Sequence, residues 1–464
     1  MKQKLKKIQV YANSLLPHET TYLLQEQKME DEEKLSILKI IAYNSNNFTH
    51  PKAFDFSIDK RKYSHLLSWM RRKLDSIDVD KQLEWILDAK KHVLLDSISQ
   101  EEEKRLLNSL KKFDSTSFYF VEFYNLLLHF RHFLLIRMRY DDYQIVNTYI
   151  EKEKFNYEKS KLVYEKMHQI SFDIIGASNL EEGEGLSWLK WLHECYEDEK
   201  LDGQNRYMAL IRISFVSLKY DRLNELKDIF LRAELFFETG KNYSKRLLLN
   251  HYGNMLILFD KLGDREKAIH YGYLSIKELE LNPDSVIYLN NLNNVLIKNQ
   301  KYEEALSLIE KSSFKVKSNK NFHATIGFVS NHIRCLSKTG KVKEAIIKGR
   351  LFFNVYHKKI LSFRWHRFFS AFLGALLIEE RHAEIIQYIE KYKLLTLRNK
   401  ETYLGKSSNI IDIYYIISRH QEGIINQDQF NENLKDMILD SAVQKEKLDK
   451  ELIEYIDKMK KHMK

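Results

Sequence analysis

The sequence predicts an all-α protein, and three observations support this fold class. First, the 464 residues include only 3 Pro and 14 Gly, fewer than the turns of a β protein or the glycine-rich loops of an α/β protein require. Second, hydrophobic residues make up 44% and charged residues 30% of the chain, which suffices to build a core. Third, apolar residues recur at three- and four-residue spacing over long stretches, the pattern of amphipathic helices. We therefore expect helices almost throughout the chain.

Residues 1–175 form a predicted N-terminal helical region. The segment 117–139 is apolar on nearly all sides, as expected of a helix buried inside a stack. The polar stretch 44–57 is a predicted loop. Residues 176–206 are a predicted boundary segment with a connecting helix, because three of the 14 glycines lie at its start. The amphipathic segments before the boundary are residues 3–16, 31–43, 62–75 and 80–95.

A repeated pattern follows the boundary, over residues 207–400. In each copy an apolar helix and a short polar turn precede a small or apolar anchor residue. The anchors are spaced 37, 40 and 40 residues apart, a period that indicates an array of helix pairs. The copies are KLGDREKAIHYG (261–272), KNQKYEEALSLI (298–309), KTGKVKEAIIKG (338–349) and EERHAEIIQYI (379–389), with anchors Ala268, Ala305, Ala345 and Ile385, and an earlier copy has Leu226 at the anchor.

The turn sequences GDREKAI, QKYEEAL and GKVKEAI resemble the inter-helix turn of tetratricopeptide repeats. This resemblance is limited to roughly residues 207–400 and implies a right-handed α-solenoid of antiparallel helix pairs, with additional helices at both ends. The turns are expected near Gly263, Gln300, Gly340 and Glu380. The repeat is longer than the usual one, and larger residues replace the small residue expected in the middle of the first helix. An irregular helical bundle is the alternative.

Residues 401–464 are predicted to form a C-terminal helical cap. They continue the helical pattern and end in the charged segment KEKLDKELIEYIDKMKKHMK. A helical repeat array needs a terminal element with a polar outer face, and this segment suits that role.

The cellular compartment is predicted by excluding secretion and membrane insertion. The two cysteines, Cys195 and Cys335, form neither a disulfide framework nor a metal-ligand spacing. The basic N-terminus is interrupted by polar residues, unlike the core of a signal peptide. The longest nearly apolar run, residues 368–378, is too short to cross a bilayer, which needs about 20 residues. We expect a cytoplasmic protein that does not bind membranes.

No familiar catalytic motif is present, so we expect no enzyme, no metal site and no cofactor. The sequence lacks a P-loop, HExxH, GxSxG, paired CxxC motifs and a strand-flanked GxGxxG. Arg246 and His251, like Arg350 and His357, match the loose Arg–His spacing of HEPN-type ribonucleases. Such spacings arise by chance in a chain with 17 His.

Positive charge is concentrated in residues 311–378, which we call the basic window. It contains fourteen Lys or Arg and one acidic residue, Glu344, and therefore carries +13, whereas the whole chain carries +10. Separation of charge on this scale attracts an anionic partner. Aromatic residues lie among the charges, and we expect most of them in the core.

Asparagine recurs fourteen residues before the anchor in three copies. The positions are Asn254, Asn291 and Asn331, and Ala371 replaces Asn in the fourth copy. In the repeats that this chain resembles, the position faces a concave groove, where asparagines hold the backbone of an extended peptide. An amide suits this because it offers both a donor and an acceptor. Positions three and seven residues further on share the same helical face. The predicted peptide-binding residues are Asn254, Asn291, Asn294, Asn331, Arg334, Lys298, Lys338 and Arg367.

These features favour a non-enzymatic scaffold or adaptor that binds an extended, acidic peptide or protein segment in the groove. The first alternative is a nucleic-acid-binding module that uses the basic window on phosphates. A further alternative is a peptide-sensing regulator. The asparagines could also simply bond a neighbouring helix, which would leave the groove without its amides.

Overall fold

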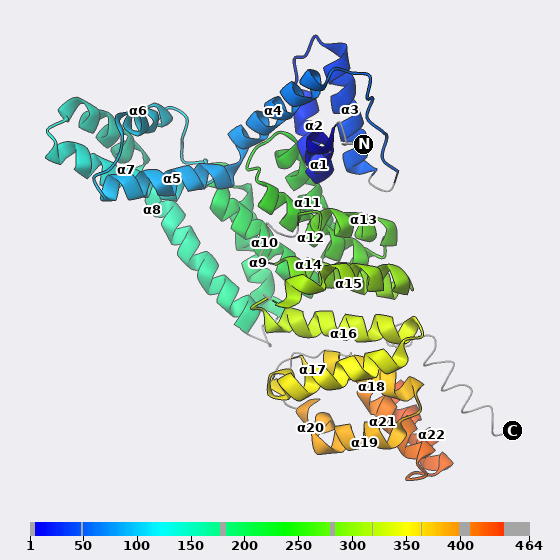
Figure 1. The fold of residues 1–464 in the computed structure, drawn as a ribbon. Helices are drawn as coiled ribbons and strands as arrows, with labels where there is room; N and C mark the ends of the chain where they lie inside the picture. The colour runs from blue at the N-terminus through cyan, green and yellow to red at the C-terminus, as the bar shows by residue number, and fades with distance from the viewer. Residues whose placement is uncertain are drawn as a thin grey trace. The chain divides into compact units, whose positions relative to one another are not determined.

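The computed structural model describes residues 5–47, 50–176, 182–278, 284–317, 319–362, 364–398 and 409–439. Within these ranges the chain forms 22 helices and no strand, so the predicted all-α class is confirmed. The chain divides into two compact units, Met1–Asn282 and Pro283–Lys464 (Figure 1). The division falls inside the predicted repeat array, whose copies belong partly to each unit. No helix in the described ranges is both long enough and apolar enough to cross a membrane.

Unit 1 is built around a hydrophobic core shared by helices from both of its ends. The segment that was predicted to be a buried helix forms α7, whose Phe123 and Phe130 are fully buried. Tyr252 of α12 belongs to the same core. The helices are α1 (Lys6–Ser14), α2 (Pro17–Glu26), α3 (Glu32–Asn46), α4 (Lys60–Ile77), α5 (Val79–Leu94), α6 (Gln100–Ser109), α7 (Phe120–Ile136), α8 (Tyr140–Gly176), α9 (Glu182–Glu197), α10 (Gly203–Lys219), α11 (Leu223–Glu238), α12 (Lys245–Leu262) and α13 (Arg265–Ser275).

Buried polar contacts fasten the start of the chain to the last helices of unit 1. His18 Nδ1 lies 2.7 Å from the hydroxyl of Tyr252. The hydroxyl of Tyr243 donates to the buried carboxylate of Glu19. Lys277 donates to the carbonyl oxygen of Leu15 at 2.7 Å, which caps the end of α1. These partners are more than 200 residues apart in the sequence, so the N-terminal helices are an integral part of this unit.

Unit 2 contains successive helix hairpins followed by a C-terminal group. Of the predicted cap, residues 409–439 form α21 and α22, and the rest lies outside the described residues. The helices are α14 (Ser285–Lys298), α15 (Tyr302–Lys317), α16 (Phe322–Lys338), α17 (Val342–Ser362), α18 (Trp365–Ile378), α19 (His382–Lys391), α20 (Leu394–Arg398), α21 (Asn409–Gln421) and α22 (Gln427–Leu439).

The helix-to-helix turns lie where the repeats predict them. Gly263, Gln300, Gly340 and Glu380 all have positive φ, between 54° and 80°, the left-handed conformation that ends a helix. Each lies five residues before its anchor. The anchors are fully buried, each with 0% exposure: Ala268, Ala305, Ala345 and Ile385. The register of the sequence repeat is therefore also the register of the packing.

The aromatic core of unit 2 fixes the position of α18. Phe368 and Phe372 are completely buried, and the ring of Phe353 on α17 lies 5.8 Å from that of Phe368 in a stacked arrangement. A Cβ atom at Gly349 would lie only 2.3 Å from Cδ2 of Phe372. A glycine is therefore required where α17 crosses this ring.

Candidate functional site

Most of the predicted peptide-binding residues lie on three neighbouring helices of unit 2. Helix α16 packs against both α14 and α18, so the three first helices of successive hairpins are adjacent (Figure 1). Asn291, Asn294 and Lys298 lie on α14, Asn331, Arg334 and Lys338 on α16, and Arg367 on α18. Asn254 lies on α12 in unit 1, where it is partly buried.

One hydrogen bond spans all three helices. Nη2 of Arg367 on α18 donates to Oδ1 of Asn294 on α14 at 2.6 Å. The side chain passes α16 at Gly327, where an added Cβ would lie 3.7 Å from Nε of Arg367 and 3.0 Å from Nδ2 of Asn290. Because Gly327 has no side chain, the side chains of Asn290 and Arg367 both have room to pack against α16 at this position.

The site brings several cations together, and Arg367 among them has no counter-charge within the described residues. Within the described part of the chain, the guanidinium group of Arg367 forms no ion pair, and its only hydrogen bond is to Asn294. Burial, together with neighbouring Arg334 and Arg364, lowers the pKa of Arg367 to about 10. Burial and the same arginines lower the pKa of His366 to about 4. Like charges held together in a partly buried place are a potential binding site for an anion. We call Arg334, Arg364, Arg367 and Asn294 the arginine cluster.

Neutral groups hold the arginine cluster in place. Nη2 of Arg334 donates to the hydroxyl of Ser370 on α18 at 2.7 Å. Because Asn294 is an uncharged acceptor, it orients the guanidinium group of Arg367 without neutralising it. An arriving carboxylate can therefore form charge-assisted hydrogen bonds, which are stronger than those to neutral acceptors.

The structure places Asn331 differently from the prediction. Its side chain has 0% exposure, and Nδ2 donates to the backbone oxygen of Asn290 at 3.4 Å. Asn290 in turn donates to the carbonyl oxygen of Ala324 at 2.8 Å. Asn331 therefore bonds a neighbouring helix, which was the alternative interpretation of the asparagine recurrence, and it is not available to a peptide in this conformation.

The other predicted residues remain accessible to different degrees. Asn291 and Lys338 are partly buried, whereas Lys298 at the end of α14 is exposed. Sequence reasoning did not single out Arg364 and His366 as site residues. Both adjoin Arg367 in the segment RWHR, which puts three basic side chains within four residues, and that density was the available signal.

The aromatic residues of the basic window are mostly part of the core. Trp365 and Phe368 are buried, and the ring of Phe352 stacks on that of Phe322, 6.1 Å away. Phe314 is exposed, at 57%, and Phe363 lies outside the described residues. Few of these rings can stack on unpaired bases.

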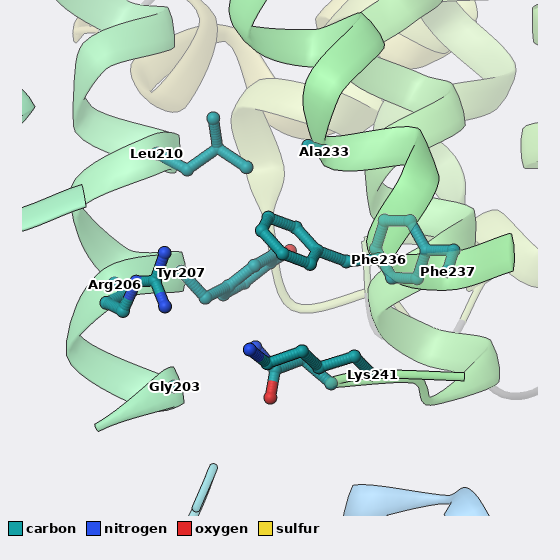
Figure 2. A pocket seen from close by; sticks show the side chains of 9 residues that line it. Gly203, Arg206, Tyr207, Leu210, Ala233, Phe236, Phe237 and Lys241 are labelled. Carbon is teal, nitrogen blue, oxygen red and sulfur yellow. The ribbon is translucent and has the colours of Figure 1, made fainter. Parts of the chain in front are cut away.

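A hollow in unit 1 lies between α10 and α11 and contains none of the predicted residues. Figure 2 shows Arg206 and Tyr207 on one side of it and Phe236 and Phe237 on the other. Arg206 lies 5.8 Å and Lys241 5.7 Å from the centre of the Phe236 ring. Arg206 also donates to the carbonyl oxygen of Tyr196. The cations are thus already engaged in helix packing.

Arg246 and His251, one of the two pairs that match the ribonuclease spacing, bind different partners. Arg246 donates to the carboxylate of Asp80 at 2.7 and 2.9 Å, whereas the buried His251 lies 3.6 Å from Glu234. In the described ranges, no group of three or more His, Cys, Asp or Glu is arranged to hold a metal ion.

Comparison with known protein families, curated proteins and solved structures finds no match.

Proposed function

We propose that the chain is a non-enzymatic helical-repeat adaptor that binds an extended, anionic peptide on the face formed by α14, α16 and α18. We further propose that its hairpins form an α-solenoid of the tetratricopeptide type. The regular five-residue offset between each left-handed turn and its buried anchor supports this proposal. In this arrangement the first helices of the successive hairpins of unit 2, α14, α16 and α18, line one continuous surface.

The observation that carries the proposal is the charge of Arg367, which no described residue compensates. Arg367 is partly buried next to two other arginines, an arrangement that costs free energy unless an anion neutralises it. A carboxylate of the ligand would supply that charge and accept hydrogen bonds from Arg367 and Arg334. Asn291 and Asn294 would contact the ligand backbone, since amides both donate and accept.

A peptide explains the site better than a nucleic acid does. The face has asparagine amides on α14 and guanidinium groups on α16 and α18. A ligand with a polar backbone and acidic side chains uses both kinds of group. Binding to single-stranded nucleic acid draws on stacking between bases and aromatic rings, and the rings here pack mostly in the core. Steep salt dependence would still identify phosphate contacts.

A direct test uses a labelled, unstructured peptide rich in Asp, the matched peptide with Asn at every Asp position, and a labelled single-stranded oligonucleotide. Fluorescence anisotropy with the full chain should show binding of the Asp peptide only. Arg334→Met and Arg367→Met should each weaken it. Lys320→Met, which removes one charge from an exposed position, should have little effect. Equal losses in all three variants, or preference for the oligonucleotide, would overturn the proposal.

A further inference from the structure

The start of α18 gathers basic side chains more closely than an extended peptide spaces its carboxylates. Arg364, His366 and Arg367 lie within four consecutive residues, and a helix rises only about 1.5 Å per residue. In an extended peptide, side chains on the same face are two residues apart, which is about 7 Å. When one carboxylate of such a peptide lies opposite this turn, the next one therefore lies beyond it.

Two of these basic residues have no counter-charge within the described residues. Arg364 is exposed, and its side chain forms neither an ion pair nor a hydrogen bond there. The guanidinium group of Arg367 bonds only to the neutral Asn294. Helix α18 contains no acidic residue, and the positive end of its dipole adds to the local field. A ligand that brings two negative charges to one point would neutralise both arginines.

Arg367 is oriented by one hydrogen bond and keeps further donors for a ligand. A guanidinium group has five N–H groups. Arg367 uses one of them, on Nη2, to reach Oδ1 of Asn294 at 2.6 Å, and its Nε has no partner among the described residues. Because this arginine is already positioned before the ligand arrives, ordering it costs little entropy on binding.

His366 responds to the charge of a ligand at this place. Burial, together with Arg364, Arg367 and Arg334, lowers its pKa to about 4, so the imidazole is neutral near pH 7 while the site is empty. Its Nδ1 has no partner among the described residues, so no hydrogen bond at this atom fixes the ring. A dianion would oppose the effect of the three arginines and favour the imidazolium, which adds a further positive charge.

A phosphate monoester has the chemistry that this turn requires. It concentrates a charge of about −1.5 to −2 at pH 7 and three acceptor oxygens in one group. The planar fork of an arginine binds such a group through two parallel hydrogen bonds. We propose that the arginine cluster recognises a phosphorylated side chain of the ligand peptide. This inference rests on the proposed peptide-binding function and names the group that the site selects.

Three versions of the Asp-rich peptide test this selection with the full chain. Their two central residues are Ser-Asn, phosphoserine-Asn or Asp-Asp, so that the last version carries the added charge on two residues instead of one. Fluorescence anisotropy should show the phosphoserine peptide binding about tenfold or more tightly than the Asp-Asp peptide, the effect of one further charge-assisted hydrogen bond. The Asp-Asp peptide should bind only slightly better than the Ser-Asn peptide.

Two variants locate the phosphate. Arg364→Met should remove most of the preference for phosphoserine over Asp-Asp, and Lys320→Met should leave this preference unchanged. Both side chains are exposed, so neither change disturbs the core. A preference that survives Arg364→Met would place the phosphate elsewhere and overturn the inference.

The peptide series also separates this inference from the proposed function. Equally tight binding of the phosphoserine and Asp-Asp peptides would overturn the inference and leave the proposed function standing. No binding of any of the three peptides would overturn both. Displacement of the phosphoserine peptide by an equal concentration of inorganic phosphate would show that the site takes the free ion, and would overturn the inference equally.

Discussion

Replacing Arg367 by Met should stabilise the ligand-free protein while weakening ligand binding. Methionine has a similar length and no charge, so it removes the repulsion from Arg334 and Arg364 and keeps the packing past Gly327. A residue retained for folding would behave in the opposite way. This combination of effects therefore distinguishes a binding residue from a structural one.

The magnitude follows from the environment of the guanidinium. Burial and the neighbouring arginines lower the pKa of Arg367 from the usual arginine value to about 10, which corresponds to about 3 kcal/mol of unfavourable free energy for the charged form. The substitution also loses the hydrogen bond to Asn294, and bonds to charged groups contribute about 1.5–3 kcal/mol. We therefore expect the free energy of unfolding to rise by about 0–2 kcal/mol. Each kcal/mol raises Tm by roughly 2–4 °C in a domain of this size.

Urea unfolding and calorimetry of the full chain measure this change. The matched control is Arg350→Met, because Arg350 donates to both carboxylate oxygens of Glu384, at 2.6 and 2.8 Å. Removing that paired arginine should destabilise unit 2 by about 1 kcal/mol. If Arg367→Met destabilised the protein as much as Arg350→Met does, the charge of Arg367 would not be uncompensated, and the reasoning would fail.

Three further predictions concern packing, backbone and pH. Ala305→Leu should cost about 1–3 kcal/mol by overpacking a fully buried anchor, and an unchanged Tm would show that the repeat register is wrong. Gln300→Gly should stabilise unit 2 by up to about 1 kcal/mol in urea unfolding, because a left-handed conformation is strained in residues other than glycine; no gain would argue against that turn. Burial lowers the pKa of His18 to about 4, against the partial opposition of Glu234. The unfolded chain therefore takes up a proton below about pH 6.5 while the folded chain does not, and this histidine alone removes about 2 kcal/mol of stability by pH 5. If the stability of His18→Gln depends less on pH over this range than that of the unmodified protein, His18 is the source of the loss.

The fold was predictable where short-range signals determine it. A left-handed residue at Gly263 or Gly340 ends a helix, and a small anchor such as Ala305 allows the next helix to pack closely, so turn and anchor can both be recognised within a few residues. The docking of α2 on α12 was not predictable, because it depends on contacts such as that between His18 and Tyr252, which are 234 residues apart.

The candidate site was predictable only in part, for the same reason. The repeat period places Asn294 and Arg334 at equivalent positions of successive first helices, and both lie in the arginine cluster. The same period predicted that Asn331 lies in the groove. In the structure, the position fourteen residues before the anchor lies where the exposed face of the first helix meets its contact with the neighbouring helix. At Asn331 and Ala371 this position is buried. A single sequence does not show whether a side chain at this position falls on the exposed face or in that contact.

Hydrogen–deuterium exchange of the full chain, with and without the Asp-rich peptide, tests the central claim most directly, because it shows where a ligand binds. The account predicts slower exchange in α14, α16 and α18, with the largest change around Arg364–Arg367 at the start of α18, and no such change in Arg367→Met. Protection confined to unit 1 or to α15 and α17, or protection that persists fully in Arg367→Met, would contradict it.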